Sequence, residues 1–95
     1  MSRRRYLFAY DIANPFRLRK TCDVFESHGT RLQYSVFLCH LTRAELEILQ
    51  YRLINIIDPT EDSIIRIDLG PQHSPADVHQ IGRPRHLPHT GPQII

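Results

Sequence analysis

The sequence predicts a small α+β domain of the ferredoxin-like class, with the order βαββαβ. In this plan a four-stranded antiparallel sheet carries two helices on one face. Strand-like runs of apolar residues occupy positions 5–12, 30–41 and 63–69, and two stretches with helical periodicity lie between them. The 95 residues suffice for one domain, and short connections favour elements that pack side by side.

The first strand and first helix carry the clearest local signals. Residues 5–12 are aromatic and aliphatic without polar alternation, which is typical of a central strand. Asn14 and Pro15 suit the N-cap and first turn of a helix over 15–28, and Gly29 suits a left-handed C-terminal residue. Apolar residues repeat along this helix at helical spacing, at Leu18, Cys22 and Phe25.

Residues 30–41 alternate between two sets of side chains and predict one long strand. The odd-numbered set contains Arg31, Phe37 and Cys39, so we expect it to form a half-apolar face that the helices leave uncovered. Such faces often become interfaces between copies, and a twofold dimer is the commonest oligomer. We therefore expect a homodimer packed through the sheets, with Phe37 in the dimer interface.

The second helix lies between Thr42 and Asp58. Thr42 and Glu45 have the spacing of a capping box, and Asp58-Pro59 ends the helix. Residues 63–69 then alternate as a third strand, with three apolar side chains on one face. We expect the fourth strand at residues 78–81.

Composition divides the chain into residues 1–82, the ferredoxin-like domain, and residues 83–95, a tail rich in Pro and His that ends in a short edge strand. No run of residues is apolar enough to cross a membrane, and we expect a cytoplasmic protein without a membrane partner. The two cysteines have no zinc-site spacing, and we expect both to be packing residues.

Charge is unevenly distributed along the chain. Residues 1–43 carry a net charge of +5 and residues 44–95 a net charge of −3, and eleven of the twelve basic residues are arginine. Arginine binds phosphate groups through paired hydrogen bonds, so this half predicts a polyanionic partner such as nucleic acid. A solvated basic surface is the alternative.

Asp11 ends the otherwise apolar first strand, so its carboxylate is a candidate functional group. A turn or cap role is the alternative. The candidate nucleic-acid contacts follow it in the basic half, at Arg17, Arg19, Lys20, Arg31 and Ser35, and their alternative role is in a solvated or strand-edge position. The consecutive Arg3, Arg4 and Arg5 are also suited to a nucleic-acid backbone.

Four motifs occur in order: Tyr10-Asp11-Ile12, Arg17-Leu18-Arg19-Lys20, the stretch 31–37 and the stretch 53–63. Together they resemble the CRISPR-associated Cas2 family over residues 5–70. Looser likeness continues at residues 80–82 and 93–95.

The resemblance implies a ferredoxin-like homodimer that serves as a DNA-binding scaffold for the CRISPR integrase (Cas1) during spacer acquisition. It also implies Mg²⁺-dependent endonuclease activity, with one Asp11 from each subunit at the metal, and RNA-binding or duplex DNA-binding. Two alternatives stay open. One is a toxin-like, stand-alone metal-dependent endoribonuclease, since the architecture also resembles the VapD toxins, and the other is a purely structural dimer.

Overall fold

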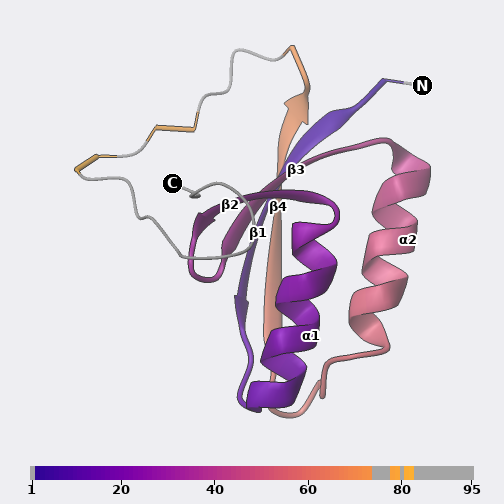
Figure 1. The fold of residues 1–95 in the computed structure, drawn as a ribbon. Coiled ribbons are helices and arrows are strands. Elements are labelled where there is room, and N and C mark those ends of the chain that lie inside the picture. The colour runs from indigo at the N-terminus through magenta and orange to yellow at the C-terminus, as the bar shows by residue number, and fades with distance from the viewer. Residues whose placement is uncertain (1, 74–77, 80, 83–95) are drawn as a thin grey trace.

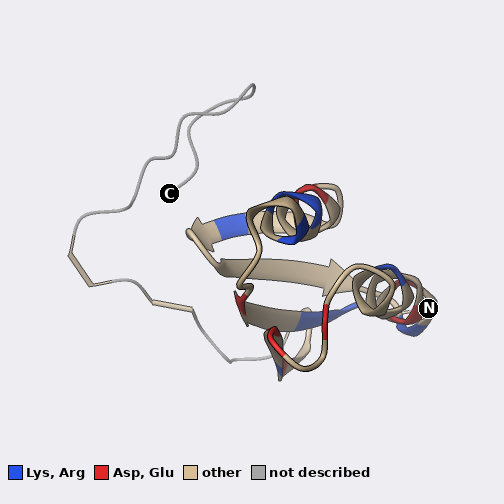
Figure 2. Cartoon of the chain, turned by 90° about the horizontal axis from the view of Figure 1, so that it is seen from below, with Lys and Arg blue, Asp and Glu red and all other residues tan. Residues whose placement is uncertain are grey.

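The computed structural model describes residues 2–73, 78, 79, 81 and 82, and it confirms the predicted α+β plan. Four strands form one antiparallel sheet in the order β2-β3-β1-β4, and both helices lie side by side against it (Figures 1 and 2). The elements in chain order are β1 (Arg4–Asp11), α1 (Pro15–Glu26), β2 (Gly29–Gln33), β3 (Val36–Leu41), α2 (Arg43–Ile54) and β4 (Ser63–Pro71).

The stretch 30–41 is a hairpin rather than the single strand that the alternation predicts. Gln33 pairs with Val36, so Tyr34 and Ser35 form a two-residue turn. The neighbouring strand holds this turn in place, because the Tyr10 hydroxyl donates to the Tyr34 carbonyl at 3.1 Å and the Tyr10 N–H donates to the Ser35 carbonyl at 3.0 Å. The hairpin supplies the fourth strand.

The prediction of a strand at residues 78–81 is wrong for the described residues, since Val78, His79 and Ile81 lie outside any strand. Gln80, the Pro- and His-rich tail at 83–95 and its expected edge strand lie outside the described residues. Among those that are described, no helix is long and apolar enough to cross a membrane.

The core lies between the helices and one face of the sheet. The ring of Phe25, from α1, packs with its centroid 5.1 Å from Phe8, 5.3 Å from Tyr10 and 5.3 Å from Phe37. Three leucines of α2 complete this layer, at Leu46, Leu49 and Leu53. Phe37 is fully buried within one protomer, and this position does not favour the predicted place in a dimer interface.

On the opposite face of the sheet, which is apolar, the described residues place no helix. Successive residues of a strand point to opposite faces, so the burial of Tyr6, Phe8 and Tyr10 turns Leu7 and Ala9 to this side. Register then places two apolar rows across three strands, Val36–Ala9–Ile65 and Leu38–Leu7–Ile67. We call these six residues the helix-free face, and Ile65 is 56% exposed there.

The helix starts follow the capping signals closely, but both helices end earlier than predicted, α1 at Glu26 rather than residue 28 and α2 at Ile54 rather than at Asp58-Pro59. The Asn14 side chain accepts hydrogen bonds from the N–H groups of Phe16 at 2.9 Å and Arg17 at 3.1 Å, which fixes the start of α1. At α2, the capping box of Thr42 and Glu45 is present in both directions.

Gly29 is required by packing rather than by a left-handed conformation. Helix α1 ends at Glu26 with Ser27 as its cap, and the φ of Gly29 is not positive, so the expected left-handed role is wrong. A Cβ built on Gly29 would lie 2.5 Å from Cys39 Sγ and 2.5 Å from the Leu38 carbonyl oxygen. Because Gly29 has no side chain, the backbone of β2 can approach β3 closely at this position.

We expect Gly29→Ala to destabilise the protein by about 1–3 kcal/mol, the usual cost of forcing a methyl group into a closely packed region. Urea unfolding followed by circular dichroism measures the change. Thr30→Ala, at the adjacent exposed position, is the matched control and should cost less. Equal losses in the two variants would contradict this explanation of the glycine.

Candidate metal and nucleic-acid site

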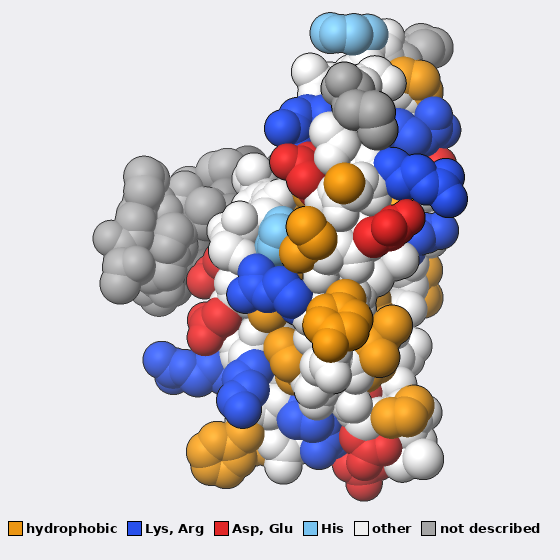
Figure 3. Space-filling view, turned by 90° about the vertical axis from the view of Figure 1, so that its right-hand side faces the viewer, with side chains coloured by type: hydrophobic (Ala, Val, Ile, Leu, Met, Phe, Trp, Pro, Cys, Tyr) orange, Lys and Arg blue, Asp and Glu red, His pale blue; other side chains and the backbone are white. Residues whose placement is uncertain are grey.

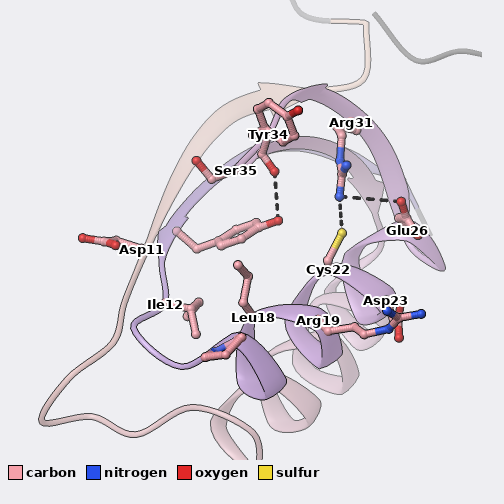
Figure 4. A pocket seen from close by; sticks show the side chains of 12 residues that line it. Asp11, Ile12, Leu18, Arg19, Cys22, Asp23, Glu26, Arg31, Tyr34 and Ser35 are labelled. Carbon is pink, nitrogen blue, oxygen red and sulfur yellow. Dashed lines mark hydrogen bonds and ion pairs between the residues drawn. The ribbon is translucent and has the colours of Figure 1, made fainter. Parts of the chain in front are cut away.

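Asp11 is the last residue of β1 and belongs to the helix-free side of the sheet. It pairs with Ser63 across β4, one row beyond the apolar row of Ala9 and Ile65. Its carboxylate is exposed and points away from the hollow beside α1 (Figure 4). Within the part of the chain that the structure describes, no hydrogen bond or ion pair engages this carboxylate. The strand thus presents one unengaged carboxylate at the border of an apolar face.

One chain offers few ligands for a metal. The described residues contain no group of three or more His, Cys, Asp or Glu side chains that could hold an ion. Magnesium keeps several waters and is commonly held by one or two carboxylates. Asp11 fits such a site, and a second copy of the chain packed on the helix-free face would supply the second carboxylate.

The loop that follows Asp11 is fixed by Asp62, whose side chain is completely buried. Its carboxylate accepts hydrogen bonds from the backbone N–H of Ala13 at 2.9 Å and of Asp58 at 2.8 Å. Arg17 donates to it through Nε at 2.8 Å and Nη2 at 3.2 Å. These bonds, led by those from Arg17, hold the pKa of Asp62 far below its ordinary value despite burial.

Arg17 is consequently a structural residue in this protein. Besides Asp62, its guanidinium binds Glu61 at 2.8 Å, so it joins the start of α1 to the loop before β4. These contacts do not favour the predicted phosphate contact. Asp62 is not among the residues predicted from sequence, although the acidic run that contains it could have suggested a partner for an arginine.

Arg31 also faces the interior rather than the surface. Its side chain is only 12% exposed, and its guanidinium stacks over the Phe37 ring at 5.2 Å. It forms an ion pair with Glu26 at 3.6 Å and a hydrogen bond with the thiol of Cys22 (Figure 4). Burial is the main cause that raises the pKa of this thiol, which therefore stays protonated. Arg31 thus ties β2 to α1, and its position does not favour the predicted nucleic-acid contact.

The remaining predicted contacts stay near the surface. Arg19 and Lys20 are exposed on α1, and Ser35 is half-buried in the hairpin turn. Arg19 and Ser35 line a hollow of about 660 Å³ between α1 and the turn. Its lining also includes the acidic residues Asp23 and Glu26 of α1, and Asp11, whose carboxylate points away from it (Figure 4). Of the five predicted contacts, only Arg19 and Lys20 are basic side chains open to solvent.

Comparison with known proteins gives one consistent result. The family model for CRISPR associated protein Cas2 matches residues 4–74. The CRISPR-associated endoribonuclease Cas2 3 of Synechocystis sp. is 44% identical over 59 residues, which cover 62% of this chain and 64% of that protein. The CRISPR-associated endonuclease Cas2 2 of Thermus thermophilus is 38% identical, with 67% of this chain and 71% of that protein covered.

A solved structure shows the same fold. The crystal structure of Streptococcus pyogenes Cas2 superposes with a TM-score of 0.72 at 35% identity, and it covers 82% of this chain and 99% of that one. The matched segment of this chain spans slightly less than two thirds of the first two curated relatives, at 64% and 66% of their lengths.

We expect Asp62→Asn to lower stability at neutral pH, because it leaves Arg17 without its buried counter-charge. An unfolded aspartate has a pKa of about 3.9, and the folded value of Asp62 lies lower. The stability contributed by the ionised carboxylate is therefore present above about pH 4 and is lost as pH falls below it. The melting temperatures of wild type and variant should converge as pH falls from about 5 towards 2.

Thermal unfolding at a series of pH values measures this convergence. Glu61→Gln, which removes the exposed partner of Arg17, is the control and should change stability little. A gap between wild type and Asp62→Asn that stays constant down to the lowest pH would show that the charge of Asp62 contributes nothing.

Proposed function

The chain belongs to the CRISPR-associated protein Cas2 family, and from this membership we propose that it is a homodimeric scaffold for spacer acquisition. In this role the dimer binds duplex DNA and bridges the CRISPR integrase (Cas1). The observation that carries the proposal is the helix-free face, an apolar surface that the described residues leave open beside Asp11.

Two copies packed through their helix-free faces would remove this surface from water. Ile65 is 56% exposed and Ile67 47% exposed, and their rows continue through β1 to β3. Exposed apolar patches of this kind mark interaction sites. In a twofold arrangement the same patch serves both partners, so each copy would bring one Asp11 to the border of the shared interface.

A second activity, Mg²⁺-dependent hydrolysis of phosphodiester bonds, is supported by Asp11 itself and by the names of the relatives. The carboxylate is unengaged within the described part of the chain, as a metal ligand requires. When bound, Mg²⁺ polarises a phosphoryl oxygen and lowers the pKa of a bound water. Two Asp11 carboxylates, one from each copy, would hold the ion, and Arg19 and Lys20 would bind neighbouring phosphates through their exposed charges.

The sparse ligand set favours the scaffold over a stand-alone, toxin-like endoribonuclease. A nuclease whose main task is turnover commonly uses several metal ligands or a dedicated acid and base. The residues that the structure describes around Asp11 offer none of these beyond the single carboxylate. Binding and bridging therefore rank as the main role, and single-stranded RNA and duplex DNA are the substrates to compare for cleavage.

We expect Asp11→Ala to abolish Mg²⁺-dependent cleavage while leaving duplex binding and integrase capture unchanged, because Asp11 makes no folding contact in the described structure. The assays are cleavage of RNA and duplex DNA, a duplex-binding titration, and co-purification with the integrase. Asp23→Ala, an exposed acid on α1, is the matched control and should keep all three.

Two results would change the proposal. If neither wild type nor variant cleaves while both bind duplex DNA and integrase, the protein is a scaffold without nuclease activity. If wild type cleaves RNA but captures neither duplex DNA nor integrase, the scaffold role is wrong and the stand-alone endoribonuclease is favoured.

A further inference from the structure

A second hollow, of about 410 Å³, lies between α2 and β4, at the opposite end of β1 from Asp11. Three arginines line it, Arg4, Arg43 and Arg66. The rest of the lining comprises two acidic residues, Glu47 and Asp68, together with Gln50, Leu46 and Tyr6. Arg4 begins the strand that Asp11 ends, so the two sites are separated by roughly 23 Å along an extended strand. Figure 3 shows basic side chains, with acidic ones among them, over the upper part of the α2 side of the molecule.

Arg66 is held in place by an aromatic ring and an amide, and the carboxylate of Asp68 interacts with its charge without forming an ion pair. Its guanidinium stacks over the Tyr6 ring at 5.7 Å and donates a hydrogen bond to Gln50 Oε1. Among the residues that the structure describes, no carboxylate forms an ion pair with it. A guanidinium has five N–H donors, so this arginine is pre-positioned and keeps donors for an external acceptor.

The other two arginines have partners that an anion can replace. Arg43 pairs with Glu47 at 3.5 Å, and these side chains are 84% and 67% exposed. Arg4 pairs with Asp68 at 3.1 Å, and both of these side chains are close to half exposed. Exposed pairs of this kind contribute little to stability because water screens them, so they exchange readily for a phosphate.

We propose that Arg4, Arg43 and Arg66 form a contact site for the phosphodiester backbone of the nucleic acid that this protein binds. The proposal rests on the nucleic-acid binding proposed above and adds a second contact surface, remote from Asp11 and from α1. Arginine matches phosphate oxygens through paired hydrogen bonds, which are stronger than neutral ones.

The test is a salt titration of nucleic-acid binding by the full chain. Equilibrium dissociation constants for a duplex DNA and for a single-stranded RNA are measured from about 50 to 200 mM salt. The double variant Arg43→Ala/Arg66→Ala should weaken binding uniformly across sequences and reduce the salt slope by about two, one for each lost phosphate contact. If the double variant loses affinity for DNA alone, the site contacts the DNA backbone. If it loses affinity for both polymers, the site contacts both backbones.

The matched control is Arg52→Ala. Arg52 is also an exposed arginine of α2, but it contacts Ser27 and His28 and does not line the hollow. The Arg52→Ala variant should bind nucleic acid with the same salt dependence of the dissociation constant as wild type. Glu47→Gln provides the reciprocal test, since it removes the carboxylate that competes with phosphate for Arg43, and it should tighten binding.

A wild-type slope in Arg43→Ala/Arg66→Ala, with folding confirmed by circular dichroism, would overturn the proposed contact site and leave the scaffold role standing. A slope change in Arg52→Ala that is half that of the double variant, one lost charge against two, would also overturn it, because net charge rather than this hollow would then govern binding. If wild type binds neither polymer, both the contact site and the proposed function are wrong.

Discussion

The stack of aromatic rings around Phe25 is the contact on which the rest of the structure depends. It fixes which face of β1 and of β3 is buried, because Phe8, Tyr10 and Phe37 all pack against this one ring from α1. Side chains along a strand alternate between its two faces, so a register shift of one residue would move every apolar side chain of that strand to the opposite face. The burial of these rings therefore leaves the residues between them on the other side, where they form the helix-free face.

The two ends of the sheet carry different functional groups. At one end, Asp62 binds Arg17 and the backbone of Ala13, and so it fixes the loop that leaves β1 just after Asp11. The buried carboxylate and its arginine act as a joint between the start of α1 and the loop before β4. Asp11 is left free of folding contacts in the described structure and is available for a ligand. At the other end, arginines gather between α2 and β4.

The sequence predicted the starts of both helices correctly. The start of α1 at Asn14-Pro15 and the capping box at Thr42 are confirmed, because these signals act through bonds within one helical turn. The hairpin was missed because its turn, Tyr34-Ser35, carries no Gly, Asn or Pro, and a bond from β1 holds it.

The facing of β3 and the roles of two arginines could not be predicted for a different reason. Alternation shows that two sets of side chains exist, but only contact with α1 decides which set is buried, and here it is the set with Phe37. Arg17 and Arg31 have the composition of phosphate contacts, yet their partners, Asp62 and Glu26, are known only once the chain is folded. The place of Asp11 at the end of a strand followed from sequence alone.

The most direct test of this account is the mass of the protein in solution, measured by sedimentation equilibrium for wild type and for two matched variants. Ile67→Asp places a charge on the helix-free face, and Ile54→Asp places the same charge on an exposed position of α2. The account predicts twice the 11.1 kDa mass of one chain for wild type and Ile54→Asp, and a single-chain mass for Ile67→Asp. A wild-type protein that sediments as one chain, or an Ile67→Asp variant that stays dimeric, would contradict it.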